Sequence, residues 1–541
     1  MKSLSETLLA PHLGELLERL GAVASTELTQ ALQAVCEAAS HGDVCVAISD
    51  KEQIAVLRDS GVVGWPGDYQ PLILDDAGRL YLHRLWSYEK DAGDAVESRL
   101  RVTIAVDEAQ LAAGLNRFFG NDPADLQRHA AETAVRHRFA IITGGPGTGK
   151  TRTILAIVAL LMEQTPEKPP RLALVASTGK AAARMRESIE RVSAELVLPP
   201  AMASQIPVGA RTIHRLLRDA GRSGFLPVDG VIIDEASMVD IGLLSRLVRV
   251  LPEKARLILI GDRSQLASVE AGAILGDLCG PGGGNAPIAR HIVELRKSRR
   301  FGENSGILVL SDAVKAGDSG AAIQILKNEK FPDVALSPSS TMNDLLRGKA
   351  LPHFQEVCAS EDVATALEKL DRFRVLCAVR QGPFGVEGVN AAMETLLKVD
   401  GDWFHGRPVL ITENDYSLNL FNGETGVAWC DDSTGQQMRV FFRGETEGTL
   451  RRFLPSNLPP HETAFAITAH RSQGSEFDEV LTILPSKDVE LLTRELLYTA
   501  ITRAKKRVFL ACSVEVLSTM IKRKIRRVSG LESRFWQPEV F

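Results

Sequence analysis

The sequence predicts an α/β fold with parallel sheets, built twice along the chain and accompanied by a small β-barrel and a separate N-terminal region. Short apolar segments at residues 139–143, 171–176, 231–233 and 257–260 alternate with helical patterns. A glycine-rich turn joins the first of these segments to a helix. A second alternating region follows, interrupted by short strands and turns. Buried strands that alternate with helices form parallel sheets, and this predicts the fold class.

Length and composition limit the class of protein. The chain has 541 residues, of which 45% are hydrophobic, so it is too long for one core and too apolar to be disordered. Its longest apolar runs are strand-sized, and its N-terminus does not fit a continuous signal-peptide core. We therefore expect several packed domains in a cytoplasmic protein.

Charge and cysteine content limit the kinds of site. The net charge of −5 gives no overall attraction to DNA, so a DNA contact requires a local basic groove. The basic segment 522–527 fits either a solvated face of the last helix or a phosphate-binding patch. The seven cysteines are scattered without a Cys-x-x-Cys pair, which argues against a disulfide framework and against a zinc or iron-sulfur site. We expect them to be small, buried hydrophobes.

The order of these patterns predicts five segments. Residues 1–105 mix helical periodicity with short strands, carry no phosphate-binding signal and form an accessory domain. Residues 106–285 form the first α/β domain, which ends in a glycine-rich loop. The second α/β domain comes in two parts, 286–405 and 461–541, because the β-barrel of residues 406–460 is inserted into it.

The glycine-rich turn has the spacing of a phosphate-binding loop. Its Gly-x-x-x-x-Gly-Lys-Thr pattern follows an apolar strand and opens a helix, the context that such a loop requires. Backbone N–H groups would hold the phosphates of ATP, Lys150 would reach the β and γ phosphates, and the Thr151 hydroxyl would bind Mg²⁺. The full spacing leaves little room for a chance glycine-rich turn. The loop consists of Gly144, Gly145, Pro146, Gly147, Thr148, Gly149, Lys150 and Thr151.

Two further strands end in side chains suited to phosphoryl transfer. Segment 231–233 leads to Asp234, which would hold the metal through water, and Glu235, which would orient the attacking water. Segment 257–260 leads to Gln265, which would sense the γ phosphate at the carboxyl edge of the sheet. Alone, an Asp-Glu pair is usually a turn, and the glutamine could equally cap a helix. The phosphate-binding loop favours the catalytic interpretation of both.

Two arginines outside the first domain are candidates to stabilise transition-state charge on the γ phosphate. Arg300 stands near the start of the second alternating region, and Arg503 stands near the C-terminus. A lone arginine usually forms a surface ion pair. Two candidates on a domain distinct from the phosphate-binding loop predict an ATP site in a cleft between domains.

Seven segments, in this order, resemble the motif series of superfamily 1 DNA helicases, and most closely the RecD family, the alpha subunits of exonuclease V. The segments are residues 144–151, 176–182, 212–216, 233–238, 261–269, 469–477 and 498–504. Residues 71–74 and 79–86 also resemble the N-terminal domain of that family. The resemblance therefore covers nearly the whole chain.

This resemblance implies two RecA-like domains, an SH3-like insertion that matches the β-barrel, and an N-terminal domain that docks on a partner. It implies an ATP-dependent 5′ to 3′ helicase of subfamily 1B that requires Mg²⁺. Such a protein is one motor of a bacterial heterotrimer with RecB-like and RecC-like subunits and processes DNA double-strand breaks for recombinational repair. The sequence shows no nuclease constellation, so DNA degradation would come from the RecB-like partner.

The resemblance also implies roles for single residues. Gln127 would recognise adenine, and Arg300 and Arg503 would contact the γ phosphate. Segment 215–230, where RecD-like enzymes carry a hairpin near the strand junction, is short here, which puts strand separation by this element in doubt. Hydroxyls and cations at loop and helix starts are the usual phosphate contacts. The implied DNA contacts are Ser177, Thr178, Lys180, Thr212, His214, Thr468, His470 and Ser472.

The alternatives to a motor are an ATP-dependent switch and a small-molecule kinase. A small-molecule kinase has no use for the segments around Gln265 and Gln473. An ATP-dependent switch that controls assembly with partners stays open. Single-stranded DNA should raise the ATPase rate of a motor steeply, whereas a partner protein should raise that of a switch. A longer, self-sufficient helicase of the RecD2 type is disfavoured because its extra N-terminal length is missing here.

Overall fold

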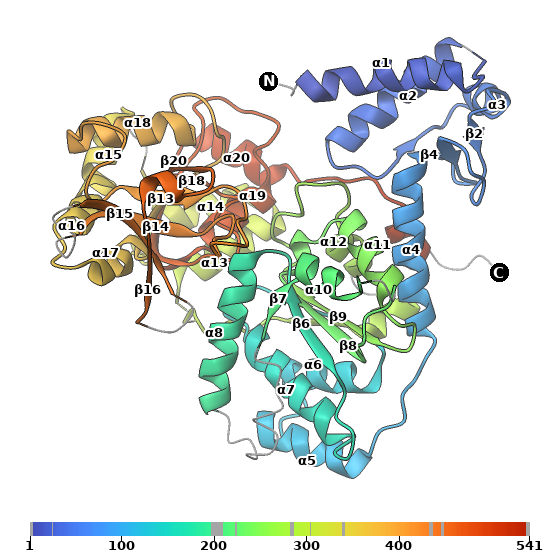
Figure 1. The fold of residues 1–541 in the computed structure, drawn as a ribbon, viewed down its shortest axis with the longest axis horizontal. Helices are drawn as coiled ribbons and strands as arrows, with labels where there is room; N and C mark the ends of the chain where they lie inside the picture. The colour runs from blue at the N-terminus through green and yellow to red at the C-terminus, as the bar shows by residue number, and fades with distance from the viewer. Residues whose placement is uncertain are drawn as a thin grey trace.

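Two α/β domains lie side by side, with the N-terminal region against the first domain and an antiparallel sheet on the second (Figure 1). Among the residues that the structure describes, no helix is long and apolar enough to cross a membrane. The computed structural model describes residues 4–23, 25–195, 209–221, 224–281, 286–302, 304–337, 341–431, 437–444 and 448–536.

The first domain is built on a six-stranded parallel sheet with the strand order β10-β5-β9-β8-β6-β7. Every residue of β5 is buried, as a strand covered by helices on both faces requires. The predicted strands β5, β6, β8 and β9 are confirmed, and each observed end lies within one residue of its prediction. The strands are β5 (Phe139–Gly144), β6 (Leu172–Ala176), β7 (Arg211–Thr212), β8 (Gly230–Asp234), β9 (Arg256–Gly261) and β10 (Ile292–Leu295).

Helices cover both faces of this sheet. Helices α5 to α8 pack on one face, and α10 to α12 pack on the other. The helices are α5 (Glu108–Phe119), α6 (Leu126–Arg136), α7 (Lys150–Glu163), α8 (Gly179–Glu195), α10 (Ile213–Asp219), α11 (Ile241–Val250) and α12 (Ile274–Cys279), with the short 3₁₀ helices η2 (Ala236–Met238) and η3 (Pro287–His291).

The N-terminal region forms a small sheet with its own apolar core and the strand order β1-β4-β3-β2. Its last helix, α4, packs on the first domain beside α11, where Asp91 accepts hydrogen bonds from Ser245 and Arg249. The end of the predicted segment 1–105 is therefore an outer layer of the first domain. The elements are α1 (Leu4–Arg19), α2 (Thr26–Ser40), β1 (Val46–Ala47), α3 (Lys51–Asp59), β2 (Val63–Gly64), β3 (Leu72–Leu74), β4 (Arg79–Leu82) and α4 (His83–Leu100).

The second domain repeats the architecture on a five-stranded parallel sheet with the order β11-β20-β19-β12-β18. Helices α13, α14, α19 and α20 cover one face, and α15 to α18 cover the other. The elements are α13 (Gly306–Ala316), α14 (Ser319–Lys327), β11 (Val334–Leu336), α15 (Met342–Lys349), α16 (Leu351–Cys358), α17 (Val363–Leu370), β12 (Phe373–Cys377), α18 (Val386–Leu397), β18 (Ala466–Thr468), β19 (Phe477–Ile483), α19 (Arg494–Ile501), β20 (Ala504–Ala511) and α20 (Val514–Lys522).

The predicted insertion is an antiparallel sheet with the order β16-β15-β14-β13-β17 and a small core of its own. No pairing closes the edge strands β16 and β17 in the described part of the sheet, so a closed barrel stays a prediction. The other face of the sheet packs on the second domain through Val427, Trp429 and Phe441. The elements are β13 (Pro408–Ile411), β14 (Thr425–Asp431), β15 (Gln437–Arg443), β16 (Leu450–Phe453), η5 (Pro455–Asn457) and β17 (His461–Thr463).

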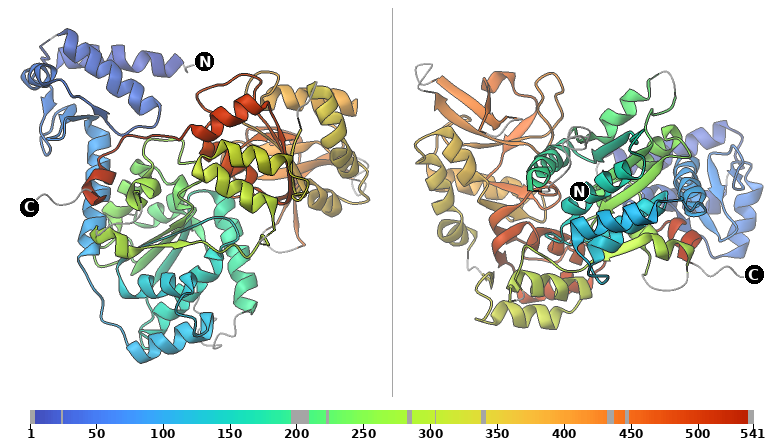
Figure 2. Two further views of the ribbon diagram at one scale, coloured as in Figure 1. Left: turned by 180° about the vertical axis from the view of Figure 1, so that it is seen from behind. Right: turned by 90° about the horizontal axis from the view of Figure 1, so that it is seen from below.

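Two predicted boundaries of the α/β domains need correction. Strand β10 pairs in parallel with β5, so the first domain extends beyond residue 285 to Leu295. The segment after α20 leaves the second domain, and its helix α21 (Leu531–Trp536) packs on the first, where Leu531 and Phe535 join the core (Figure 2). Helix α20 ends at Lys522, so the basic segment is mostly not a helix face, and Arg527 donates to the backbone carbonyls of the loop after β9.

The predicted state of the cysteines is confirmed in part. All seven are free thiols, and four of them, Cys36, Cys45, Cys279 and Cys377, are buried. The other three, Cys358, Cys430 and Cys512, are partly exposed.

Candidate active site between the two domains

The phosphate-binding loop lies between β5 and α7, as its spacing predicts. Gly147 and Gly149 have φ values of 75° and 83°, in the left-handed region that glycine adopts without a Cβ penalty. A Cβ on Gly147 would lie 2.4 Å from the Cβ of Arg300, so glycine also permits this close approach. Lys150 opens α7, and its Nζ donates to the carbonyl oxygens of Gly144 (2.7 Å) and Gly145 (3.1 Å).

Gln127 holds this loop from α6. Its Nε2 donates to the carbonyl oxygen of Thr148 at 2.7 Å, and its Oε1 accepts from Arg299 at 2.9 Å. The Gln127 side chain is 5% exposed. It therefore joins the loop to the segment that connects the two domains, and its implied contact with adenine stays a prediction.

The predicted acidic pair ends β8. Asp234 accepts a hydrogen bond from the backbone N–H of Glu235 at 2.9 Å. Burial, together with the adjacent Glu235 carboxylate, raises the pKa of Asp234, and the nearby Lys150 ammonium opposes this shift. Glu235 has a φ of 51°, a left-handed conformation that is uncommon outside glycine and that concentrates at functional sites.

The phosphate-binding loop and the acidic pair face a cavity of about 340 Å³ between the two domains. Three polar atoms of residues that line it are buried and have no hydrogen-bond partner within the described part of the chain: Nε of Arg152, Oε1 of Gln265 and Nη1 of Arg300. Each unpaired buried polar group lowers the stability of the fold by about 1–3 kcal/mol, so these atoms fit a polar ligand such as a nucleoside triphosphate.

The side chains in this cavity also fit a magnesium ion. Thr151, Asp234 and Glu235 all line it with oxygen atoms, the ligand type that Mg²⁺ prefers. Two neighbouring carboxylates, one with a raised pKa, favour a cation beside them.

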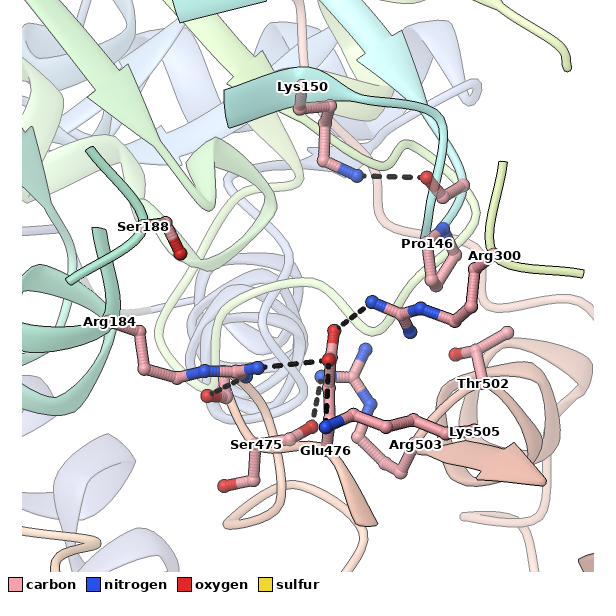
Figure 3. Close-up of polar contacts among 12 residues, drawn as sticks. Pro146, Lys150, Arg184, Ser188, Arg300, Ser475, Glu476, Thr502, Arg503 and Lys505 are labelled. Carbon is pink, nitrogen blue, oxygen red and sulfur yellow. Dashed lines mark hydrogen bonds and ion pairs between the residues drawn. The ribbon is translucent and has the colours of Figure 1, made fainter. Parts of the chain in front are cut away.

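A partly buried cluster of charges from both domains lies at the edge of the cavity (Figure 3). Glu476 pairs with Arg300 from the connecting segment and with Arg184 from α8, the latter at 3.1 Å. Burial by itself would raise the pKa of Glu476, but the charges of Arg184, Arg300 and Arg503 outweigh it and hold the pKa at about 2. The cluster thus ties the first domain to the second through a carboxylate.

Arg503 reaches the cavity from the segment between α19 and β20. Its Nη1 donates to the carbonyl oxygen of Ser475 at 3.2 Å, and its side chain is 3% exposed. Burial lowers the pKa of Arg503, and the charge of Glu235 across the cavity opposes this shift. The cavity therefore brings Arg300 and Arg503 to the phosphate-binding loop, as the prediction of a cleft between domains requires.

The predicted DNA contacts lie in two groups. Ser177, Thr178 and Lys180 follow β6 of the first domain, where Thr212 ends β7 and His214 follows it. In the second domain, Thr468 ends β18 and His470 follows it. Lys180 Nζ donates to the carbonyl oxygen of Gly423 in the insertion, and burial lowers the pKa of Lys180 to about 8. Thr178, Thr212 and Thr468 each accept a backbone N–H.

The prediction for Ser472 does not agree with the structure. Its side chain is fully buried, and its hydroxyl donates to the carbonyl oxygen of Ala469 at 2.6 Å. The hydroxyl therefore stabilises the turn after β18, and the side chain presents no surface to DNA.

Sequence reasoning missed Arg152, Arg184, Arg299 and Glu476. Arg184 stands four residues after Lys180 on α8, and residues at this spacing share one face of a helix. That spacing was a usable signal. Glu476 stands within the recognised segment 469–477, but nothing local indicates that it accepts ion pairs from both domains.

Two domain profiles match this chain. The profile of an AAA domain matches residues 127–271, and the profile of a UvrD-like helicase C-terminal domain matches residues 463–511. The first match contains the phosphate-binding loop, the acidic pair and Gln265, and the second contains Glu476 and Arg503.

Several curated proteins are similar over most of the chain. The RecBCD enzyme subunit RecD of Mycolicibacterium smegmatis is 37% identical, with 89% of this chain and 86% of that protein covered. The RecD subunit of Mycobacterium tuberculosis is 36% identical over 97% of this chain and 94% of that protein. The ATP-dependent RecD2 DNA helicase of Deinococcus radiodurans is 27% identical, with 86% of this chain and 60% of that protein covered.

Solved helicase structures match more distantly. The Pif1 helicase from Candida albicans has 16% sequence identity and a TM-score of 0.41, with 73% of this chain and 96% of that chain covered. The Bacteroides Pif1 helicase in complex with ADP-AlF3 and ssDNA has 18% identity and a TM-score of 0.39, with 72% of this chain and 90% of that chain covered.

Proposed function

This chain belongs to the RecD family of RecBCD enzyme subunits, and we propose that it is a motor that moves 5′ to 3′ along one strand of DNA. RecD relatives and the helicase domain profiles support an ATP-hydrolysing DNA helicase that works in a multi-subunit complex. The 5′ to 3′ polarity rests on the resemblance of the motif series to subfamily 1B. The function is helicase action in the repair and recombination of broken DNA.

The cavity between the domains is the observation that carries this proposal. Lys150 holds the β and γ phosphates of ATP, and Glu235 orients the attacking water. Arg300 and Arg503 stabilise the charge that develops on the γ phosphate, and Gln265 senses its loss. When bound, Mg²⁺ neutralises phosphate charge, and Thr151 and Asp234 hold it. A site shared by two domains couples hydrolysis to a change in their separation.

The DNA strand follows the two groups of polar side chains outside this cavity. Ser177, Thr178, Lys180, Thr212 and His214 contact its backbone from the first domain, and Thr468 and His470 contact it from the second. Backbone contacts position a strand without reading its sequence. Because the groups stand on different domains, opening and closing of the ATP cleft moves one group past the other.

RecB-like and RecC-like subunits are the partners, with the RecC-like subunit docked on the N-terminal region. Large apolar side chains are exposed there, among them Leu20 (59%), Trp65 (53%) and Tyr69 (95%). Exposed aromatic and aliphatic side chains favour a protein interface. The complex acts in the bacterial cytoplasm, where chromosomal DNA is found, and strand cleavage is assigned to the RecB-like subunit.

Two measurements test the motor. The ATPase rate of the purified chain is measured with single-stranded DNA and, separately, with partner subunits. A steep rise with DNA supports a motor, whereas a rise only with partners supports an ATP-dependent switch. Unwinding of duplexes with 5′ or 3′ tails then gives the direction. A preference for 3′-tailed duplexes would contradict the proposed polarity.

Co-purification tests the partnership. We expect the chain to bind RecB-like and RecC-like subunits together, and Trp65→Ala with Tyr69→Ala to weaken that binding without lowering the DNA-stimulated ATPase rate of the chain alone. Unchanged assembly of this double variant would contradict docking through the N-terminal region.

A further inference from the structure

Gln265 is held in place by a neighbouring carboxylate. Its Nε2 donates to Oδ2 of Asp262 at 3.2 Å, while Oδ1 of Asp262 accepts the backbone N–H of Ser264 at 3.0 Å. The Gln265 Oε1 has no hydrogen-bond partner among the residues that the structure describes, and the residue lines the cavity beside the phosphate-binding loop. Asp262 therefore fixes one end of the Gln265 amide and leaves the other end for the site.

The same Asp262 oxygen accepts a second hydrogen bond from the other domain. Tyr498 on α19 donates its hydroxyl to Oδ2 of Asp262 at 2.8 Å. Both side chains are almost completely buried, with exposures of 2% for Tyr498 and 3% for Asp262. Burial and the charge of Asp262 raise the pKa of Tyr498 well above its ordinary value, so its hydroxyl keeps its proton and donates.

Two further bonds join the same loop of the first domain to the second. The backbone N–H of Leu266 donates to Oγ1 of Thr499 at 3.0 Å, and Nε2 of Gln473 donates to the Leu266 carbonyl oxygen at 3.0 Å. Thr499 also accepts from Nε of Arg503 at 3.2 Å. One helix of the second domain thus places the Gln265 loop and Arg503 together.

We propose that Tyr498 is a positioning residue, whose hydroxyl holds Asp262 and through it directs Gln265 to the γ phosphate only while the second domain is closed on the first. Separation of the domains breaks the bond between Tyr498 and Asp262, because its two partners stand on different domains. Gln265 then loses its fixed orientation when Arg503 withdraws. Gln265 therefore senses the γ phosphate only when the two domains are closed.

This inference rests on the proposed role of Gln265 in ATP hydrolysis and goes beyond it by naming the residue that controls it. Tyr498→Phe removes the hydroxyl and keeps the buried ring. Loss of one hydrogen bond to a carboxylate should lower kcat for DNA-stimulated ATP hydrolysis about tenfold. KM for ATP should change by less than about twofold, because the contacts of ground-state binding remain.

Tyr81→Phe is the matched control. Tyr81 is equally buried and donates its hydroxyl to the buried carboxylate of Glu89 at 3.1 Å, but in the N-terminal region. Thermal unfolding of the full chain should show similar losses of stability for the two variants. Only Tyr498→Phe should lower kcat. Equal kcat values for the two variants would overturn the proposal.

A double-variant cycle distinguishes positioning from a general structural effect. In a chain that carries Gln265→Ala, Tyr498→Phe should lower kcat no further, because the hydroxyl acts through Gln265. If the double variant instead showed the product of the two separate reductions in kcat, the proposal would be overturned. It would also be overturned if Tyr498→Phe lowered kcat and Gln265→Ala did not. Failure of the proposed function looks different, since the unaltered chain would then show no DNA-stimulated ATPase.

Discussion

The two α/β domains share one architecture, yet only the first has a phosphate-binding turn. In the first, β5 leads through glycines to α7, which begins with Lys150 and Thr151 beside the cavity. In the second, β12 leads through a comparable glycine-containing turn to α18. There the carbonyl oxygens of the turn itself accept the first N–H groups of the helix, from Val386 and Glu387.

The two turns also differ in charge. Glu387 stands in the first turn of α18, where its carboxylate pairs with Arg380, and a negative charge at a helix N-terminus repels phosphate. The second domain contributes Arg503 and Glu476 instead. A repeated fold thus supplies one site, and a few residues at the strand ends decide which domain binds the nucleotide and which responds to it.

Replacement of Lys150 should have the largest effect on ATP hydrolysis, because this residue belongs to the domain that binds the nucleotide. Lys150→Gln takes away the charge that holds the β and γ phosphates and unpacks no core residue. We expect kcat for ATP hydrolysis to fall roughly a thousandfold, with thermal unfolding unchanged. Steady-state ATPase assays with single-stranded DNA measure this.

The corresponding turn of the second domain supplies the control. Arg380 pairs with Glu387 and Glu462 on the surface, so Arg380→Gln should leave the ATPase rate unchanged. In a complex with a RecB-like motor, Lys150→Gln should slow movement on the 5′-ended strand and spare partner-driven unwinding. Near-normal ATPase activity in Lys150→Gln would end the assignment of the phosphate-binding loop.

Glu235→Gln separates nucleotide binding from hydrolysis. The amide keeps the size of the side chain but accepts no proton from water, so kcat should fall about a hundredfold or more. Binding of a fluorescent ATP analogue should persist, because Lys150 and the backbone of the loop still hold the phosphates. Loss of nucleotide binding in this variant would show that Glu235 has another role.

The smallest expected effect concerns the ion pairs between the domains. Since the folded pKa of Glu476 is about 2, against an ordinary 4.5, its ionised form stabilises the fold above about pH 4.5. That contribution is lost as the pH falls towards 2. Its upper limit is about 3 kcal/mol, from the size of the shift.

Thermal unfolding of Glu476→Gln measures this effect. The Tm of the variant should lie below that of the unaltered chain, and the difference in Tm should stay constant from pH 7 to about pH 5. The difference should become smaller as the pH falls below 4.5. A difference in Tm that stays constant down to pH 3 would contradict the depressed pKa of Glu476.

The sequence by itself determined the strands and loops whose structure depends on residues that are adjacent in the chain. The strand at 139–143, the loop that ends in Lys150 and the acidic pair at Asp234 could all be predicted, because a short apolar run and the residues just after it specify their own backbone. The carboxyl ends of parallel strands meet at one edge of a sheet, so these residues gather whatever the rest of the chain does.

Only the tertiary structure decided which distant segments meet. Strand β10 completes the first sheet, Arg527 crosses back to the loop after β9, and Ser472 is fully buried. Glu476 becomes a link between domains because Arg184 and Arg300 reach it from the other side. Such contacts depend on how two cores dock, and hydrophobic periodicity over a few residues carries no record of that geometry.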